Sequence, residues 1–248
     1  MPAEDHYLRL PEANVVATDA LQETLYNIGE VIDAHAMMCI HGDAGLGKTL
    51  SVNQTLRDLA PESTFRIQLR ERPTPRYLRH SLFSALGISG RMPARPAEFD
   101  RLLKTVLAEQ LRIFVCDEAQ WQSPECFEYW RHLWDDRRTE MAVIFVGGGD
   151  CYRVLRREPM LASRIFIWQE FRRLSTSQVR QVMPVFHPIW AEAAPDDLDF
   201  IDEHAAHGNF RLWAKLTYHL VRMLERTGQQ QVNRPLLLHV FSKLGGRG

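Results

Sequence analysis

The residues with the clearest chemical meaning in this 248-residue chain lie in a glycine-rich segment, residues 41–49, which reads His-Gly-Asp-Ala-Gly-Leu-Gly-Lys-Thr. The segment fits the pattern G-x-x-x-x-G-K-[ST], which cradles phosphate groups. Its glycines allow backbone angles that a Cβ atom would forbid, so successive N–H groups can point at one phosphate. We expect Lys48 to reach the β- and γ-phosphates of a nucleotide, and the Thr49 hydroxyl to bind Mg²⁺. The residues expected to hold the nucleotide are Gly42, Asp43, Ala44, Gly45, Leu46, Gly47, Lys48, Thr49 and Leu50.

The flanks of this segment are those that a phosphate loop requires. Residues 36–40 form a short apolar run typical of a buried strand, and residues 48–60 continue with helical spacing. The positive end of the helix dipole would then face the same phosphate. A chance glycine turn would predict neither flank, and we interpret the segment as a nucleotide-binding loop.

An acidic pair follows a second apolar run. Residues 111–116 are mostly apolar and lead directly into Asp117 and Glu118. A carboxylate at this point can hold Mg²⁺ opposite Thr49, and a second one can orient the attacking water. We therefore assign Asp117 to the metal and Glu118 to polarising the water. An acid at the end of a strand is common by itself, and its place one strand after a phosphate loop gives it meaning.

Three further residues allow two interpretations each, and a glycine segment follows the fourth expected strand. Gln120 is either a polar residue near the γ-phosphate or a helix-capping or solvent-facing residue. Arg164 can reach a nucleotide held by a neighbouring subunit, or form a surface ion pair. Arg211, at the start of a helix, can fold back onto the γ-phosphate, or be an ordinary exposed arginine. The glycines 147–149, followed by Asp150, favour a flexible turn.

The order of the expected elements predicts the fold class. Strands alternate with helices up to about residue 172, which favours a parallel sheet with helices on both faces and ligands at the carboxyl ends of its strands. We expect an N-terminal arm over 1–15, a nucleotide-binding domain over 16–172 and an α-helical lid over 173–248. The expected strands are 36–40, 64–69, 111–118, 141–147 and 165–167, and the expected helices are about 18–35, 48–60, 77–87, 97–110, 124–136, 152–157, 198–206, 210–226 and 235–244, with a further capped start at 175–178.

Composition excludes some classes of protein. The net charge is −1, so no global field attracts a polyanion, although a local basic stripe would be enough to bind one. Cys39 and Cys116 lie in apolar runs, and the four cysteines show no C-x-x-C spacing, which argues against a disulfide framework or a zinc site. Neither a membrane span nor a signal peptide is evident, so we expect a cytoplasmic protein without a membrane partner.

The ordered set of motifs resembles an AAA+ ATPase: the loop at 42–49, Asp117–Glu118, Arg164 and Gly208-x-x-Arg211. The resemblance covers roughly residues 17–225. It implies a P-loop fold with a parallel five-stranded sheet and a small helical lid, ATP and Mg²⁺ as cofactors, and Lys48, Glu118 and Arg164 as catalytic residues. In related ATPases a polar side chain after the fourth strand senses the γ-phosphate, and here the three glycines leave Asp150 or the backbone to do so.

Within that family, residues 66–87, with Pro-Thr-Pro between strand and helix, and residues 161–165 are similar to the TniB, TnsC and MuB group of transposition ATPases. The resemblance implies ATP-dependent rings or helical filaments around double-stranded DNA, a transposase as partner, and a role as transposition regulator or target selector. Loops after the second strand would touch the DNA backbone, and arginines can do so without reading bases. The candidates are Arg70, Arg72, Arg76, Arg91 and Arg95.

A second hypothesis is a nucleotide-switched module that grips a protein partner and has no role on DNA. Two features favour this hypothesis: the near-neutral net charge, and four tryptophans that we interpret as exposed. The tryptophans are Trp121, Trp130, Trp134 and Trp190.

Overall fold

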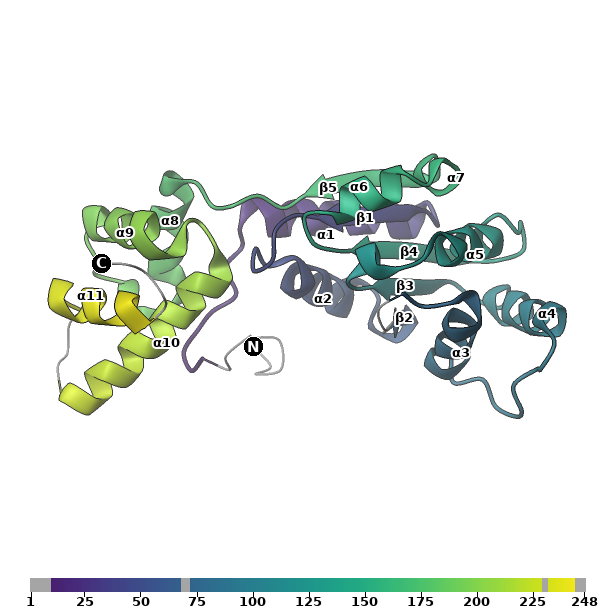
Figure 1. The fold of residues 1–248 in the computed structure, drawn as a ribbon, viewed down its shortest axis with the longest axis horizontal. Coiled ribbons are helices and arrows are strands. Elements are labelled where there is room, and N and C mark those ends of the chain that lie inside the picture. Colours follow the sequence, from purple (N-terminus) through teal and green to yellow (C-terminus); the bar gives the residue numbers. More distant parts are fainter. Residues whose placement is uncertain (1–9, 68–71, 229–231, 244–248) are drawn as a thin grey trace. The chain divides into compact units, whose positions relative to one another are not determined.

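The structure, a computed structural model, describes residues 10–67, 72–228 and 232–243. Its internal contacts divide the chain into two compact units. The sheet unit consists of Glu23–Ala44 and Ser51–Phe171, and the helical unit of Met1–Gln22, Gly45–Leu50 and Arg172–Gly248. Figure 1 labels the helices and strands of both units.

The sheet unit is built on five parallel strands in the order β2-β3-β4-β1-β5. This confirms the predicted parallel α/β sheet. β4 is apolar and buried along its whole length, and β1 and β3 are apolar and buried except for His41 and Arg112 at their ends, as expected for strands covered on both faces. The strands are β1 (Met37–His41), β2 (Thr64–Ile67), β3 (Arg112–Cys116), β4 (Met141–Val146) and β5 (Ile165–Glu170).

Helices cover both faces of this sheet (Figure 1). Alternate strand residues, such as Cys39 and Phe145, pack in one core with α3 to α7. On the opposite face Thr24 of α1 accepts a hydrogen bond from Gln169 of β5, over 3.0 Å. The helices are α1 (Asp19–Asp33), α2 (Lys48–Leu59), α3 (Pro75–Ala85), α4 (Pro96–Leu107), α5 (Pro124–Trp134), α6 (Cys151–Arg156) and α7 (Pro159–Ala162), with short 3-10 turns η1 (Pro61–Ser63) and η2 (Ala119–Trp121).

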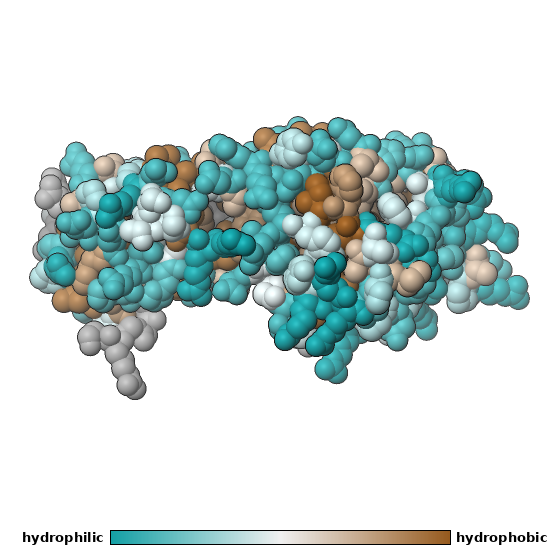
Figure 2. All heavy atoms as spheres, turned by 90° about the horizontal axis from the view of Figure 1, so that it is seen from above, coloured by the Kyte–Doolittle hydropathy of each residue, from teal (hydrophilic) through white to brown (hydrophobic). Residues whose placement is uncertain are grey.

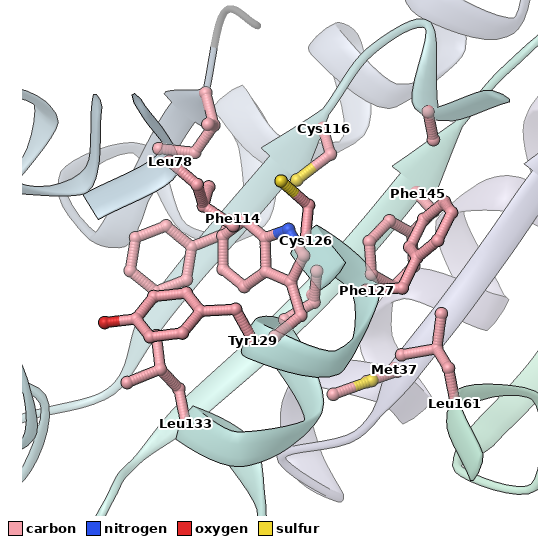
Figure 3. Packing of buried hydrophobic residues seen from close by; sticks show 14 of the residues in the cluster. Met37, Leu78, Phe114, Cys116, Cys126, Phe127, Tyr129, Leu133, Phe145 and Leu161 are labelled. Carbon is pink, nitrogen blue, oxygen red and sulfur yellow. The ribbon is translucent and has the colours of Figure 1, made fainter. Parts of the chain in front are cut away.

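Helix α5 supplies the largest side chains of this core. Figure 3 shows the ring of Phe127 beside that of Phe145, and the two centroids lie 6.0 Å apart at a steep angle, a favourable aromatic arrangement. Trp130 is fully buried, and its indole N–H donates to the side-chain oxygen of Gln122 over 3.0 Å. Burial raises the pKa of the Cys116 thiol, which lies in the same core. This cysteine therefore packs as a small apolar residue.

The helical unit has a core of its own. Trp190 and Trp213 pack edge to face with centroids 5.4 Å apart, and Trp190 donates to Thr217 over 2.9 Å. The expected helix start at Ser175 is a capping box with Gln178. Its elements are α8 (Thr176–Phe186), the 3-10 turn η3 (Pro188–Trp190), α9 (Pro195–Ile201), the π-helical turn η4 (Asp202–Ala206), α10 (Phe210–Thr227) and α11 (Arg234–Lys243).

The described part of the N-terminal arm lies against α8. The backbone N–H of Asn14 donates to the carbonyl of Phe186 over 2.8 Å, and a ring nitrogen of His187 lies 3.1 Å from the carbonyl oxygen of Pro11. Burial lowers the pKa of His187, so the neutral ring is favoured here. None of the helices in the described ranges is long and apolar enough to cross a bilayer.

Three expectations are wrong in detail. The strand expected over 165–167 runs on to Glu170, because β5 pairs with β1 up to His41. The helix expected over 198–206 is α-helical only to Ile201 and then widens into a π-helical turn. Two of the tryptophans interpreted as exposed are buried, Trp130 at 0% and Trp190 at 1% exposure.

The end of β1 gives a testable prediction, because Gly42 has a positive φ of 140° and lies against Phe171. A Cβ added to Gly42 would come within 3.0 Å of the Phe171 carbonyl oxygen. We expect Gly42→Ala to lower the free energy of unfolding by about 1–3 kcal/mol, through overpacking and backbone strain. The measurement is denaturant unfolding of the purified protein.

Gly29, inside α1, provides the matched control, since a Cβ there would have no neighbour within 4 Å. Gly29→Ala is expected to raise stability by about 0.5–1 kcal/mol, as in any open helical site. Equal stability of the parent and Gly42→Ala would contradict the close approach of Gly42 to Phe171.

Candidate functional site

The pairing of the strands brings three sequence motifs to one edge of the sheet unit. Ile40 of β1 lies beside Val146 of β4, and Cys116 of β3 lies beside Phe145. The segments that leave these strands therefore start side by side at the carboxyl edge, where ligands bind in open α/β sheets. These segments are the phosphate loop, the acidic pair and the three glycines, and a Cβ on Gly149 would lie 3.2 Å from a carboxylate oxygen of Asp43.

The phosphate loop has the backbone that its glycines were expected to allow. Gly42, Gly45 and Gly47 have φ values of 140°, 85° and 96°. A Cβ on Gly47 would meet nothing within 4 Å, so φ alone requires glycine there. Lys48 and Thr49 begin α2, as predicted, so the N-terminal dipole of this helix lies at the end of the loop.

Within the helical unit, the middle of the loop is held by the start of α10. The backbone N–H of Arg211 donates to the carbonyl of Gly45 over 3.0 Å. Asn209 caps α10 by accepting from the N–H groups of Arg211 and Leu212, and a Cβ on Gly45 would come within 3.0 Å of its amide oxygen. Arg211 is exposed at this point. Its predicted contact with a nucleotide stays a prediction.

The acidic pair forms a tight turn after β3. The carboxylate of Asp117 accepts the backbone N–H of Glu118 over 2.9 Å. Glu118 is exposed and has a left-handed backbone, with φ 50° and ψ 42°. A non-glycine residue in this region is uncommon, and such strain clusters at functional sites.

Gln120 links the acidic pair to the glycine turn. Its side-chain oxygen accepts the backbone N–H of Gly148 over 3.1 Å, and its side-chain nitrogen donates to the carboxylate of Glu118. A Cβ on Gly147 would come within 3.0 Å of that same side-chain oxygen and of the sulfur of Cys151. The turn expected to be merely flexible is thus packed against Gln120.

Arg164 forms an ion pair within the sheet unit. Its guanidinium donates to both carboxylate oxygens of Asp135, over 2.5 and 2.8 Å, and to the carbonyl of Met160 over 2.5 Å. The pKa of Asp135 is lowered, since hydrogen bonds and charge from Arg164 and Arg131 outweigh the opposing effect of burial. A role toward another subunit would require Arg164 to leave Asp135, and it stays a prediction.

The described arginines predicted to touch DNA lie around the start of α3 and in the segment between α3 and α4. Arg72 and Arg76 are exposed at its start, and the N–H of Arg72 donates to the carbonyl of Trp121 over 3.1 Å. Arg91 and Arg95 are exposed in the segment that follows α3. Arg70 lies outside the described residues.

The donor set suits Mg²⁺ held jointly with phosphate. In such sites Mg²⁺ takes one or two protein oxygen ligands, and phosphates and water supply the rest. The hydroxyl of Thr49 and the carboxylate of Asp117 are oxygen donors of this type, and their role as joint Mg²⁺ ligands stays a prediction. Among the described residues there is no cluster of three or more histidine, cysteine, aspartate or glutamate side chains that could hold a metal ion.

Sequence reasoning missed Asn209, Asp202 and Asp135. Asp202 accepts from the backbone of Gly208 over 2.7 Å and from the indole of Trp213 over 2.9 Å, and so shapes the turn before α10. The pair Gly208-Asn209 carried a usable signal, because glycine and then asparagine before an apolar helix is a cap pattern. Nothing in the sequence paired Arg164 with Asp135, which lies 29 positions away.

Together the fold and the loop define a P-loop nucleotide-binding protein. The family described as AAA domain matches residues 32–155, which is half of the chain. The chain therefore belongs to the AAA family and is an AAA+ ATPase by class. None of the proteins with curated descriptions matches it.

Solved structures of AAA+ proteins share the fold at low identity. The Cdc6p protein of Pyrobaculum aerophilum has a TM-score of 0.74 and 14% identity, over 95% of this chain and 70% of that one. The ORC1 protein of Aeropyrum pernix, solved in complex with DNA, has a TM-score of 0.66 and 17% identity, over 90% and 64%. The RuvB Holliday junction branch migration motor of Thermotoga maritima has a TM-score of 0.62 and 12% identity, over 94% and 72%.

The ion pair of Arg164 makes its predicted role testable. If Arg164 acts on a neighbouring subunit's nucleotide, Arg164→Ala should spare nucleotide binding and lower turnover of the assembled protein by about 10³-fold or more. The measurement is ATP hydrolysis over a range of protein concentrations.

Asp135→Ala is the control, because it breaks the same ion pair and keeps the guanidinium. We expect it to cost stability and to leave assembly-dependent turnover largely intact. An equal loss of turnover in both variants would mean that Arg164 serves only the fold.

Proposed function

We propose that this AAA+ protein hydrolyses ATP with Mg²⁺ at the carboxyl edge of its sheet. The observation that carries the proposal is that the start of the phosphate loop at residues 42–44, the acidic pair and the glycine turn leave the sheet at one edge, as set by the pairing of β1, β3 and β4. Backbone N–H groups of the loop would bind the phosphates, and Lys48 would balance their charge. Mg²⁺, held by Thr49 and Asp117, would supply charge stabilisation at the γ-phosphate.

In this proposal each protein group has one task. Glu118 accepts a hydrogen bond from the attacking water and orients it in line with the γ-phosphate. Its exposure and left-handed backbone support this role, since it is not committed to the core. The helical part from residue 173 onward serves as a lid, with Arg211 directed to the γ-phosphate. Arg164 acts on the nucleotide of a neighbouring subunit.

We further propose that the protein assembles with ATP on double-stranded DNA and acts as a transposition regulator that recruits a transposase. The support is the similarity of residues 66–87 and 161–165 to transposition ATPases and the exposure of Arg72, Arg76, Arg91 and Arg95. Arg72 and Arg76 lie at the start of α3, and Arg91 and Arg95 lie in the segment between α3 and α4. Exposed arginines of this kind can contact the DNA backbone without reading bases. A known structural relative, ORC1 of Aeropyrum pernix, was solved with DNA.

An alternative is a switch that grips a protein partner without DNA. The observation that favours it is exposed apolar surface on the sheet unit, where Phe166 of β5 is 58% exposed and Met160 of α7 57%. Figure 2 shows brown, apolar atoms gathered on the face of the molecule seen from above, among hydrophilic ones. Of the four tryptophans interpreted as exposed, Trp121 has a large exposed surface, at 48%.

The role of Glu118 predicts a separation of binding from turnover. Glu118→Gln should bind ATP as the parent does and hydrolyse it about 100-fold more slowly or worse, because a neutral amide polarises the attacking water far less than a carboxylate does. Binding of a fluorescent ATP analogue and release of phosphate measure the two properties. Lys48→Ala is the reference for failed binding, and Glu118→Gln turning over at the parental rate would reject the assignment.

Association with DNA is tested by its dependence on salt. A gel shift with duplex DNA and a slowly hydrolysed ATP analogue should show binding whose log affinity falls linearly with log salt. Replacing Arg72 and Arg76 with alanine, or Arg91 and Arg95, should each reduce the slope by about 2.

The control is Arg222→Ala with Arg226→Ala on α10, which removes the same charge from the helical unit. This control should leave the slope unchanged. Assembly with ATP that is indifferent to DNA would overturn the DNA role and favour the protein partner.

A further inference from the structure

Gln120 has contacts that neither capping nor solvent exposure explains. It lies within the turn η2, whose flanking residues are Glu118 and Gln122, and its own side chain bonds Glu118 on one side and Gly148 at the end of β4 on the other. Helix η2 also packs against α6, the helix that follows the glycine turn. The carboxamide therefore spans the space between the acidic pair and the turn.

The chemistry of its partners fixes the orientation of this carboxamide. The backbone N–H of Gly148 can only donate, so the side-chain oxygen must face it. The ionised carboxylate of Glu118 can only accept, so the side-chain nitrogen must face that group. Of the residues with this length, only glutamine offers one donor and one acceptor in the required places.

The glycine turn is shaped to admit this side chain. A Cβ on Gly147 would come within 3.0 Å of the side-chain oxygen of Gln120, and one on Gly148 would lie 3.5 Å from its nitrogen. The position of the turn is itself fixed, because Gly147 donates to Ile40 of β1 over 2.9 Å and Cys151 donates to Gly148 over 3.0 Å. Gln120 thus connects Glu118 to a rigid part of the sheet.

We propose that Gln120 is a positioning residue for Glu118, which ties its carboxylate to the backbone at the end of β4. The inference rests on the proposed function, in which Glu118 orients the attacking water. Each carboxylate oxygen has two acceptor sites, so the bond to Gln120 leaves acceptor capacity for the water. Gln120 also presents a polar group next to Gly147 and Gly148, which have no side chain to offer one.

The test compares two substitutions that are close in size to glutamine. Gln120→Leu removes both bonds, and Gln120→Glu keeps an acceptor for Gly148 but sets a second carboxylate against Glu118. Both should lower kcat by about 10- to 100-fold, the cost of displacing a reacting group by roughly an ångström. Affinity for a non-hydrolysable ATP analogue should stay within about twofold, because the ground state does not use Glu118.

A double-mutant cycle with Glu118→Gln distinguishes a positioning role of Gln120 from a purely structural one, because only a positioning role makes the two losses of turnover non-additive. If Gln120 acts through Glu118, adding Gln120→Leu to Glu118→Gln should lower the residual turnover no further. The charge control is Gln181→Glu on the exposed side of α8, which should leave kcat unchanged. Thermal melting of each variant identifies any that fails to fold. If one of the two Gln120 variants does not fold, the test is made with the other.

Two outcomes overturn the inference and leave the proposed function standing. One is a parental kcat in Gln120→Leu while Glu118→Gln is inactive, and the other is an additive loss in the double mutant. If instead the parent and Glu118→Gln release phosphate equally slowly, the proposed function fails and the inference fails with it.

Discussion

The parallel pairing of β1, β3 and β4 is the constraint on which the proposed site depends. Their registers place Ile40, Val146 and Cys116 near one edge, so the segments that follow must leave the sheet together. The core behind this edge is apolar and fully buried, which holds the strand ends in place. If the pairing register of one strand shifted by a single residue, its side chains would turn to the opposite face of the sheet and its motif would move away from the others.

Many of the polar groups at this edge are backbone N–H groups, and directing them toward one point requires backbone conformations with positive φ. Glycines with positive φ free the N–H groups of the phosphate loop, and Gly147 leaves room for the carboxamide of Gln120. Glu118 accepts a left-handed backbone that costs free energy. In the helical unit, the N–H of Arg211 donates to the carbonyl of Gly45, and the side chain of Asn209 packs against the Cα of Gly45. Packing and hydrogen bonding thereby restrain the loop at Gly42 and at Gly45.

The sequence was sufficient to locate the five strands, although β5 runs on to Glu170, because short apolar or alternating segments mark them. It was sufficient for the phosphate loop for the same local reason. The burial of Trp130 and Trp190 was not predictable from local pattern. Trp130 packs against Phe114 and Phe145 of two strands, and Trp190 bonds Thr217, 27 positions along the chain. The same holds for the bond of Gln120 to Gly148, 28 positions away, and for the ion pair of Arg164. Local pattern identifies the motifs, and only tertiary pairing identifies what each side chain touches.

The measurement that tests the account most directly is a crystal structure with Mg²⁺ and a non-hydrolysable ATP analogue. The account predicts the triphosphate on the backbone N–H groups of residues 42–49, with Lys48 at its outer phosphates. It also predicts Asp117 on the metal side and Glu118 facing the γ-phosphate across a water. An empty loop, or a bound triphosphate with both acids directed away from it, would contradict the central claim.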